Sequence, residues 1–142
     1  MKRTLTYFAV TFLSAMIISA CKKDDDGTYN CPLSLSTKAP ADGLVVYSVT
    51  LESGAGVANL ITYQGTSGKV TLNNPDLPFH VTIDVKADDI ISIATNVTAM
   101  HGKIAVGYAF SDPGGVNPEV NTQYCENCKS GTGSLGSVLS SQ

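Results

Sequence analysis

Hydrophobic and polar residues alternate along several stretches of the chain with the two-residue period of a β-strand. The clearest stretch is 79–86, in which polar side chains occupy one face and the other face carries Phe79, Val81, Ile83 and Val85. This pattern is typical of a strand with one side in a core and the other in water. The same period predicts strands over 44–51, 57–64, 69–72, 90–95 and 103–110, and an edge strand within 119–124.

Turn-forming residues separate the predicted strands. Glycine-rich turns lie at 53–56 and 65–68, and Asp88-Asp89 forms a corner before residue 90. The turn at 53–56 predicts that the strands on either side of it pair as a hairpin. Short strands at this spacing predict an all-β fold, a small antiparallel immunoglobulin-like β-sandwich of about 6–7 strands. A small barrel is the alternative.

The first 20 residues have the layout of a secretory signal. Lys2 and Arg3 form a positive end, and residues 5–20 are mostly apolar but interrupted by hydroxyl side chains. This run is shorter than the roughly 20 apolar residues that a spanning helix needs. The tetrapeptide Ile18-Ser19-Ala20-Cys21 resembles the lipobox of bacterial lipoproteins, in which the cysteine is lipidated and becomes the first residue after cleavage. An ordinary cleaved signal is the alternative.

A dense charge cluster follows the cysteine at once. It resembles the export tag found after the lipidated cysteine in surface lipoproteins of Bacteroidetes-type bacteria, and a solvated run in a flexible linker is the alternative. Acyl chains on Cys21 would anchor the chain in the lipid bilayer of the outer membrane, because each buried methylene contributes about 0.8 kcal/mol. We therefore expect a bacterial cell-envelope protein that is either surface-exposed or inward-facing. The candidate tag residues are Lys22, Lys23, Asp24, Asp25 and Asp26.

The rest of the chain is long enough for one domain. We expect a lipoprotein signal peptide over 1–20, a lipidated cysteine with a flexible charged linker over 21–43, and a β-sandwich domain over 44–128. A flexible Gly/Ser-rich tail is expected over 129–142. Removal of the signal leaves seven basic and twelve acidic residues. This acidic balance argues against nucleic-acid binding.

Three phrases in the predicted domain resemble the extracytoplasmic domain of MmpS-type transport accessory proteins. They are "VVYSVT", "GVANLITYQG" and "LPFHVTIDV", within residues 44–110. Phe79 stands where that family tends to have tryptophan, and 106–108 lacks a cysteine that could form a disulfide there. The resemblance implies a small membrane-held β-sandwich that acts as a noncatalytic partner of an envelope transport system, with no cofactor.

Three cysteines remain after Cys21. Cys125 and Cys128 form a CxxC pair, and Cys31 lies far upstream. A CxxC can be a redox pair, half of a zinc site or a disulfide. In an exported chain we expect a disulfide, either Cys125 to Cys128 or one of them to Cys31, and no metal site.

No stretch of the sequence has the spacing of a catalytic motif, so we expect a noncatalytic binding or accessory domain for an envelope protein. The alternative function is a surface adhesin or a glycan- or ligand-binding lipoprotein. Glycan sites usually use exposed aromatic rings, whereas four aromatic residues here, Tyr47, Phe79, Tyr108 and Phe110, fall on predicted core faces. Tyr63 and Tyr124 are the candidate ligand contacts, together with Tyr29.

Overall fold

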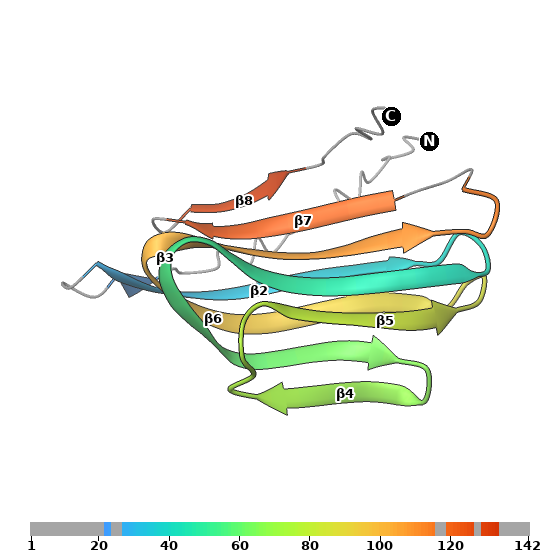
Figure 1. Ribbon diagram of the computed structural model, residues 1–142, viewed down its shortest axis with the longest axis horizontal. Helices are drawn as coiled ribbons and strands as arrows, with labels where there is room; N and C mark the ends of the chain where they lie inside the picture. Colours follow the sequence, from blue (N-terminus) through green and yellow to red (C-terminus); the bar gives the residue numbers. More distant parts are fainter. Residues whose placement is uncertain (1–21, 24–26, 116–118, 127–128, 134–142) are drawn as a thin grey trace, which may run out of the picture.

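The computed structural model of the chain describes residues 22–23, 27–115, 119–126 and 129–133. These residues form eight strands and no helix, and every strand pairing is antiparallel. The predicted all-β antiparallel class is therefore confirmed. The strands are β1 (Lys22–Lys23), β2 (Thr28–Lys38), β3 (Gly43–Gly65), β4 (Gly68–Asn73), β5 (Phe79–Val85), β6 (Ile90–Ser111), β7 (Glu119–Glu126) and β8 (Lys129–Gly133) (Figure 1).

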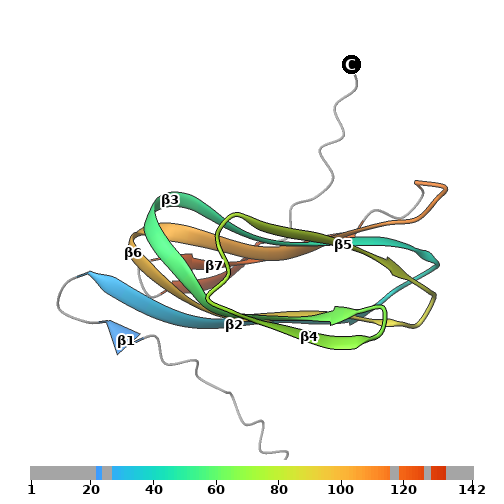
Figure 2. The same cartoon turned by 60° about the horizontal axis from the view of Figure 1, so that its bottom comes forward.

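Two long strands, β3 and β6, organise the whole sheet. They contain 23 and 22 residues and pair with each other along almost their full length, from Leu44 opposite Ser111 to Tyr63 opposite Ile93. The register shifts near the middle of β3, first between Leu51 and Ser53. Both strands bend at this point, so that each contributes one half to each of two facing layers (Figure 2).

The two layers belong to one continuous, curled sheet. In one layer the order is β4, the second half of β3, the first half of β6, β2 and β1. In the other layer the order is β5, the first half of β3, the second half of β6, β7 and β8. The more specific expectation of an immunoglobulin-like sandwich stays a prediction.

The hydrophobic core lies between the layers. Alternate residues of β2, β3 and β6 point into it, as the two-residue period requires. Full burial of each such side chain stabilises the fold by about 1.5–3 kcal/mol. The largest fully buried side chains are Tyr47, Tyr108, Phe110, Ile61, Ile91, Ile93 and Ile104.

The backbones of β3 and β6 approach each other closely where the strands bend. A Cβ atom on Gly102 would lie 2.2 Å from the carbonyl oxygen of Ser53. Gly54 has a φ of 70°, and a Cβ there would lie 2.4 Å from the carbonyl oxygen of His101. Glycine is therefore required on both strands at the bend. Beside it, Lys103 and Glu52 form an ion pair with a distance of 2.9 Å between Nζ and Oε2.

The predicted hairpin around residues 53–56 is wrong. The stretches 44–51 and 57–64 are the two halves of β3, and each pairs with β6 instead of with the other. Likewise, 90–95 and 103–110 belong to the single strand β6. The glycines of 53–56 mark a bend, since the chain continues into the facing layer there instead of reversing within one layer.

The predicted boundaries of the domain are also too narrow. Residues 28–38, expected within a flexible linker, form β2, with Tyr29, Cys31 and Leu33 buried in the core. At the other end, 129–133 pair with β7 as β8, although a flexible tail was expected from residue 129. In β2 the inward residues Tyr29, Cys31, Leu33 and Leu35 do follow the two-residue period of a strand, but the serines, threonines, proline and lysine between and beside them give the stretch the composition of a linker.

We predict that Gly102→Ala lowers the free energy of unfolding by about 3 kcal/mol, because the new methyl group meets backbone that no side-chain rotation can move. Gly115→Ala is the control. Gly115 has a positive φ of 63°, which Gly102 does not have, but a Cβ there meets no atom within 4 Å, so we expect only the conformational loss of about 1 kcal/mol. Urea denaturation measures both values. Equal losses in the two variants would contradict the close crossing of the strands.

Candidate functional site

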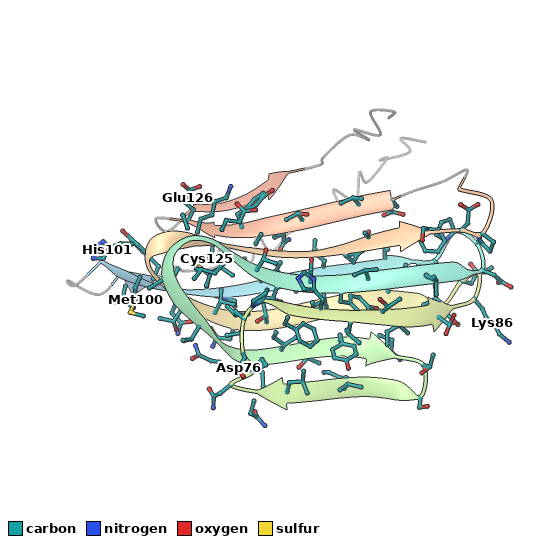
Figure 3. The ribbon with its side chains drawn as sticks, in the orientation of Figure 1. Asp76, Lys86, Met100, His101, Cys125 and Glu126 are labelled. Carbon is teal, nitrogen blue, oxygen red and sulfur yellow. A yellow bond between two sulfur atoms is a disulfide. The ribbon has the colours of Figure 1, made fainter. Side chains whose placement is uncertain are left out.

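An open cleft of about 1020 Å³ lies at the end of the molecule opposite the bends of β3 and β6. Several loops and strand ends meet there. Lys86 marks this end in Figure 3, whereas Met100, His101 and Glu126 lie at the bend end. The segments that line the cleft are 42–44, 64–66, 83–86, 88–90 and 111–113.

The cleft is acidic. Five aspartates and one lysine line it, together with apolar side chains from β5 and from the start of β6. Ile90 is 56% exposed at its rim, and Leu44 is 43% exposed. The cleft therefore offers apolar surface beside carboxylates. The charged lining residues are Asp42, Asp84, Asp88, Asp89, Asp112 and Lys86.

Two of these aspartates hold the loop between β5 and β6. Asp42 Oδ1 accepts a hydrogen bond of 2.8 Å from the backbone N–H of Ala87. Asp89 Oδ2 accepts one of 2.8 Å from the backbone N–H of Lys86. Both carboxylates thus satisfy backbone donors of the loop, which fixes this wall of the cleft.

Backbone contacts to the segment between β2 and β3 hold the same loop. The N–H of Ala39 donates to the carbonyl oxygen of Asp89 at 2.8 Å, and the N–H of Asp88 donates to the carbonyl oxygen of Ala39 at 2.9 Å. Asp88 has a φ of 67°, a left-handed conformation that aspartate tolerates better than most residues. The corner predicted at Asp88-Asp89 is thus part of the cleft wall.

The arrangement of the cleft suits the binding of an organic or peptide ligand better than the coordination of a metal ion. Within the described ranges, no group of three or more His, Cys, Asp or Glu side chains is placed to hold a metal ion. The carboxylates of Asp42 and Asp89 are already occupied by backbone donors. What the cleft can offer a ligand is negative charge next to apolar surface.

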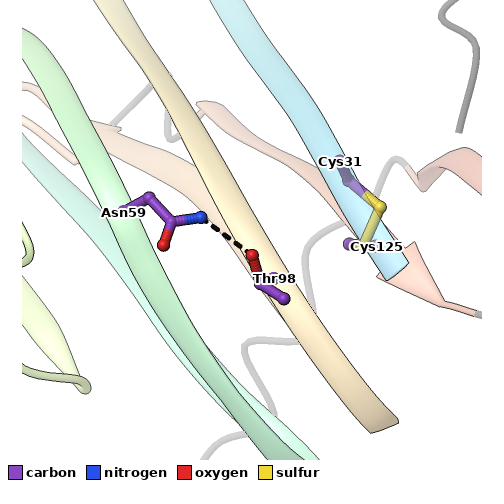
Figure 4. The surroundings of a disulfide bond; sticks show 4 residues. All are labelled: Cys31, Asn59, Thr98 and Cys125. Carbon is purple, nitrogen blue, oxygen red and sulfur yellow. Dashed lines mark hydrogen bonds between the residues drawn. A yellow bond between two sulfur atoms is a disulfide. The ribbon is translucent and has the colours of Figure 1, made fainter. Parts of the chain in front are cut away.

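A disulfide joins the two layers on the side of the molecule where β2 and β7 face each other. Cys31 on β2 and Cys125 on β7 are bonded, their Cα atoms are 5.9 Å apart, and 94 positions separate them in sequence (Figure 4). Both cysteines are buried. Of the pairings left open by the sequence, the structure thus forms Cys31 to Cys125, and Cys128 lies outside the described residues.

A hydrogen bond connects the same two strands farther along. The backbone N–H of Ser34 on β2 donates to Oε1 of Gln123 on β7 at 3.0 Å. Although β2 and β7 share no ladder, they are therefore linked by one covalent and one polar contact. Figure 4 also shows the Asn59 amide of β3 donating to the Thr98 hydroxyl of β6, at 2.8 Å.

The two tyrosines proposed as ligand contacts lie toward different ends of the molecule. Tyr63 is half-buried on the core side of β3, and its ring centroid is 5.6 Å from that of Tyr47 and 5.8 Å from that of Phe79. Tyr124 lies on β7 near the bend, with Lys103 Nζ 4.0 Å from the centroid of its ring. The structure does not bring the two rings together. Tyr29, the third candidate, is buried in the core.

The candidate anchor and export tag lie mostly outside the described residues. Cys21, Asp24, Asp25 and Asp26 are among those not described. Lys22–Lys23 form β1, in which Lys22 pairs with Asn30 of β2. The described residues contain no helix long and apolar enough to cross a membrane.

A buried tyrosine beside the end of β6 carries the largest electrostatic perturbation. Tyr108 is 2% exposed, and its hydroxyl donates a hydrogen bond of 2.6 Å to Oε1 of Glu119 on β7. Burial, followed by this bond to Glu119, raises the pKa of Tyr108 to about 12. Burial also raises the pKa of Tyr47, although a hydrogen bond from the backbone N–H of Ser92 opposes the shift. Both shifts favour the neutral phenol.

Comparisons with known protein families, curated proteins and solved structures give no match for this chain. The similarity of residues 44–110 to MmpS-type proteins therefore remains a hypothesis based on the sequence phrases. The acidic cleft also had no motif that could have revealed it. Its only signal in the sequence was the corner at Asp88-Asp89.

We predict that the free energy of unfolding falls as the pH rises from 10 to 12. The unfolded chain loses its tyrosine protons near pH 10, whereas folded Tyr108 keeps its proton until about pH 12. The stabilisation is thus complete below pH 10 and is lost above it, by about 2–3 kcal/mol for a shift of this size. Denaturation at a series of pH values measures the slope.

Tyr108→Phe is expected to make that fall shallower because it removes the group responsible. Tyr63→Phe is the matched control, since it also removes one phenol hydroxyl but leaves Tyr108, Tyr47 and the contact between Lys103 and Tyr124 in place, so the fall due to Tyr108 should persist. An unchanged slope in Tyr108→Phe would mean that Tyr108 does not hold its proton more tightly in the folded protein.

Proposed function

We propose that this chain is a lipid-anchored, noncatalytic lipoprotein of the bacterial cell envelope, whose all-β domain binds another envelope protein, such as a component of a transport system. The anchor would be Cys21, at the end of the tetrapeptide Ile18-Ser19-Ala20-Cys21. The charged residues that follow it would keep the start of the tether in water. The outer membrane is the proposed location.

The observation that carries the proposal is the buried disulfide between Cys31 and Cys125. Structural disulfides persist in oxidising compartments and are rare in reducing ones. This bond therefore supports export, which is also what the apolar run before Cys21 indicates. The two lines of support are independent, because one comes from the fold and the other from the signal-like segment.

The noncatalytic role is supported by what the polar groups of the cleft contact. Asp42 and Asp89 bind backbone N–H groups of the loop that forms the cleft wall. The hydroxyls of Tyr47 and Tyr108 are likewise engaged in hydrogen bonds inside the molecule. These polar groups stabilise the fold. The proposed role as a transport accessory rests in addition on the similarity of residues 44–110 to MmpS-type domains.

A second candidate function is a surface adhesin or glycan-binding lipoprotein. One observation favours it: the outer face of the layer containing β2 and β4 is rich in uncharged hydroxyl and amide side chains, which can exchange hydrogen bonds with sugar hydroxyls. Tyr63 and Tyr124, the aromatic contacts expected from the sequence for this role, do not lie on that face, since Tyr63 is on the core side of β3 and Tyr124 is on β7 in the other layer. The exposed residues that define the face are Asn30, Ser34, Ser36, Thr71 and Asn73.

Metabolic labelling with radioactive palmitate in a bacterium that processes lipoproteins tests the anchor. We expect the full chain to incorporate label and to sediment with membranes, and Cys21→Ser to do neither. Cys128→Ser is the matched control and should behave as wild type. Equal labelling of Cys21→Ser and wild type would contradict lipidation at Cys21.

Affinity capture of the same labelled protein from detergent-solubilised envelopes tests the role. A tag placed after Gln142 leaves the proposed anchor intact. Recovery of a specific envelope protein, together with a domain that is protected from external protease, is expected for an accessory subunit. A fully accessible domain that captures no protein but binds immobilised glycans would favour the adhesin instead.

A further inference from the structure

The strand β5 has one unpaired side. It pairs with the first half of β3, from Gly43 opposite Val85 to Val49 opposite Phe79. On its other side no described strand pairs with it. A row of backbone N–H and C=O groups is therefore available there, and such an edge is a template for another strand.

The core is also less well covered along this edge. Val45, Tyr47 and Val49 on the neighbouring strand β3 are completely buried. By contrast, three of the four inward residues of β5 are only partly buried, although they pack against the same core, and only Val85 at the end of the strand is buried. The layers on this side are joined by the corner 74–78 alone, since β4 and β5 do not pair. The partly buried inward residues of β5 are Phe79, Val81 and Ile83.

We propose that a second copy of this chain pairs with β5 through its own β5, antiparallel and centred on Thr82, so that the protein forms a two-fold symmetric dimer. This dimer goes beyond the proposed function and does not depend on lipidation, because the edge is a property of the folded domain. In this register Val81 lies opposite Ile83 of the second copy, and Phe79 opposite Val85. The partly buried inward side chains of β5 in the two copies then form one continuous apolar row across the dimer.

Charge and hydrogen bonding favour this register. His80, Thr82 and Asp84 lie on the outer face of β5 and alternate with the inward residues. Pairing centred on Thr82 places His80 of each copy opposite Asp84 of the other, so that an imidazole N–H can donate to a carboxylate twice per dimer. A register shifted by one residue would place the inward residues of one copy opposite the outward residues of the other. Polar side chains would then lie on the buried face, which is unfavourable.

Parallel pairing is disfavoured by the acidic cleft. Asp84 and the cleft lie at the end of β5, so a parallel partner would bring two clefts with five aspartates each side by side. In the antiparallel dimer they lie at opposite ends of a seven-residue ladder, roughly 20 Å apart. That is more than twice the screening length of about 8 Å at physiological ionic strength.

The edge strand β4, on the same open side of the other layer, does not offer the same site. β4 is also unpaired on one side, but it carries Lys69 on its exposed face and is one residue shorter than β5. An exposed lysine on an edge strand is a common device that prevents pairing. Between Phe79 and Val85, β5 contains no lysine and no proline.

Cysteine cross-linking in cells that express the full chain tests the dimer. In a Cys128→Ser background, Thr82→Cys places two thiols directly opposite each other across the symmetry axis. Directly opposed residues of antiparallel strands have Cα atoms about 4.5–5.5 Å apart, within disulfide range. Mild oxidation should therefore give a covalent dimer on a non-reducing gel, and the background alone should not.

Thr71→Cys in the same background is the matched control, because Thr71 is an exposed threonine on the edge strand β4. We expect at least about tenfold less dimer from Thr71→Cys than from Thr82→Cys. Equal yields would overturn the proposal. Because the background retains Cys21, loss of lipidation would appear as a change in membrane sedimentation and would not be mistaken for loss of the dimer.

A charge exchange tests the register. In the Thr82→Cys chain, His80→Asp opposes two carboxylates and should lower the cross-linking yield about tenfold. Adding Asp84→His restores a His–Asp pair in each position and should restore the yield. If the doubly exchanged chain is folded by circular dichroism but stays as low as the single variant, the pairing of His80 with Asp84 is wrong.

Discussion

The bond between Cys31 and Cys125 is the constraint on which the closed shape of this domain most depends. The two layers are halves of one sheet, connected by the bends of β3 and β6, and a curled sheet of this kind has two open sides. On the side of β2 and β7 the disulfide holds the layers together, aided by the hydrogen bond from Ser34 to Gln123. Because it links residues 94 positions apart, the chain-entropy model assigns it a stabilisation of roughly 4–5 kcal/mol.

The difference between the two sides explains where the surface is suited to interaction. Beside the disulfide, the inward side chains are almost completely buried, as Cys125, Ile104 and Val97 show. On the side of β4 and β5, the part of the chain that the structure describes has no disulfide between the layers, and Phe79 and Ile83 remain partly exposed. The acidic cleft lies at the end of this open side. The disulfide closes one side of the domain. The surface suited to contact with other molecules therefore lies on the opposite side, along β4 and β5, and at the end of the molecule that carries the cleft.

Much of the fold could be predicted from the alternation of residues, whereas the connections between strands could not. Segment 79–86 follows the period strictly and forms β5 as expected, and the predicted core positions Tyr47, Tyr108 and Phe110 are buried. The glycines at 53–56 predict a hairpin turn, because local sequence does not distinguish a reversal from a bend into a facing layer. The disulfide pairing likewise depends on which strands face each other, and the cleft depends on loops that meet only in three dimensions.

The most direct test of this account is a disulfide map of the full chain isolated from cell envelopes without reduction. Free thiols are blocked first, and the protein is then digested and analysed by mass spectrometry before and after reduction. We predict a peptide containing Cys31 joined to one containing Cys125, with Cys128 outside that bridge. A bridge between Cys125 and Cys128, or a blocked free thiol at Cys31, would contradict it, because the two layers would then lack the bond that closes the sheet.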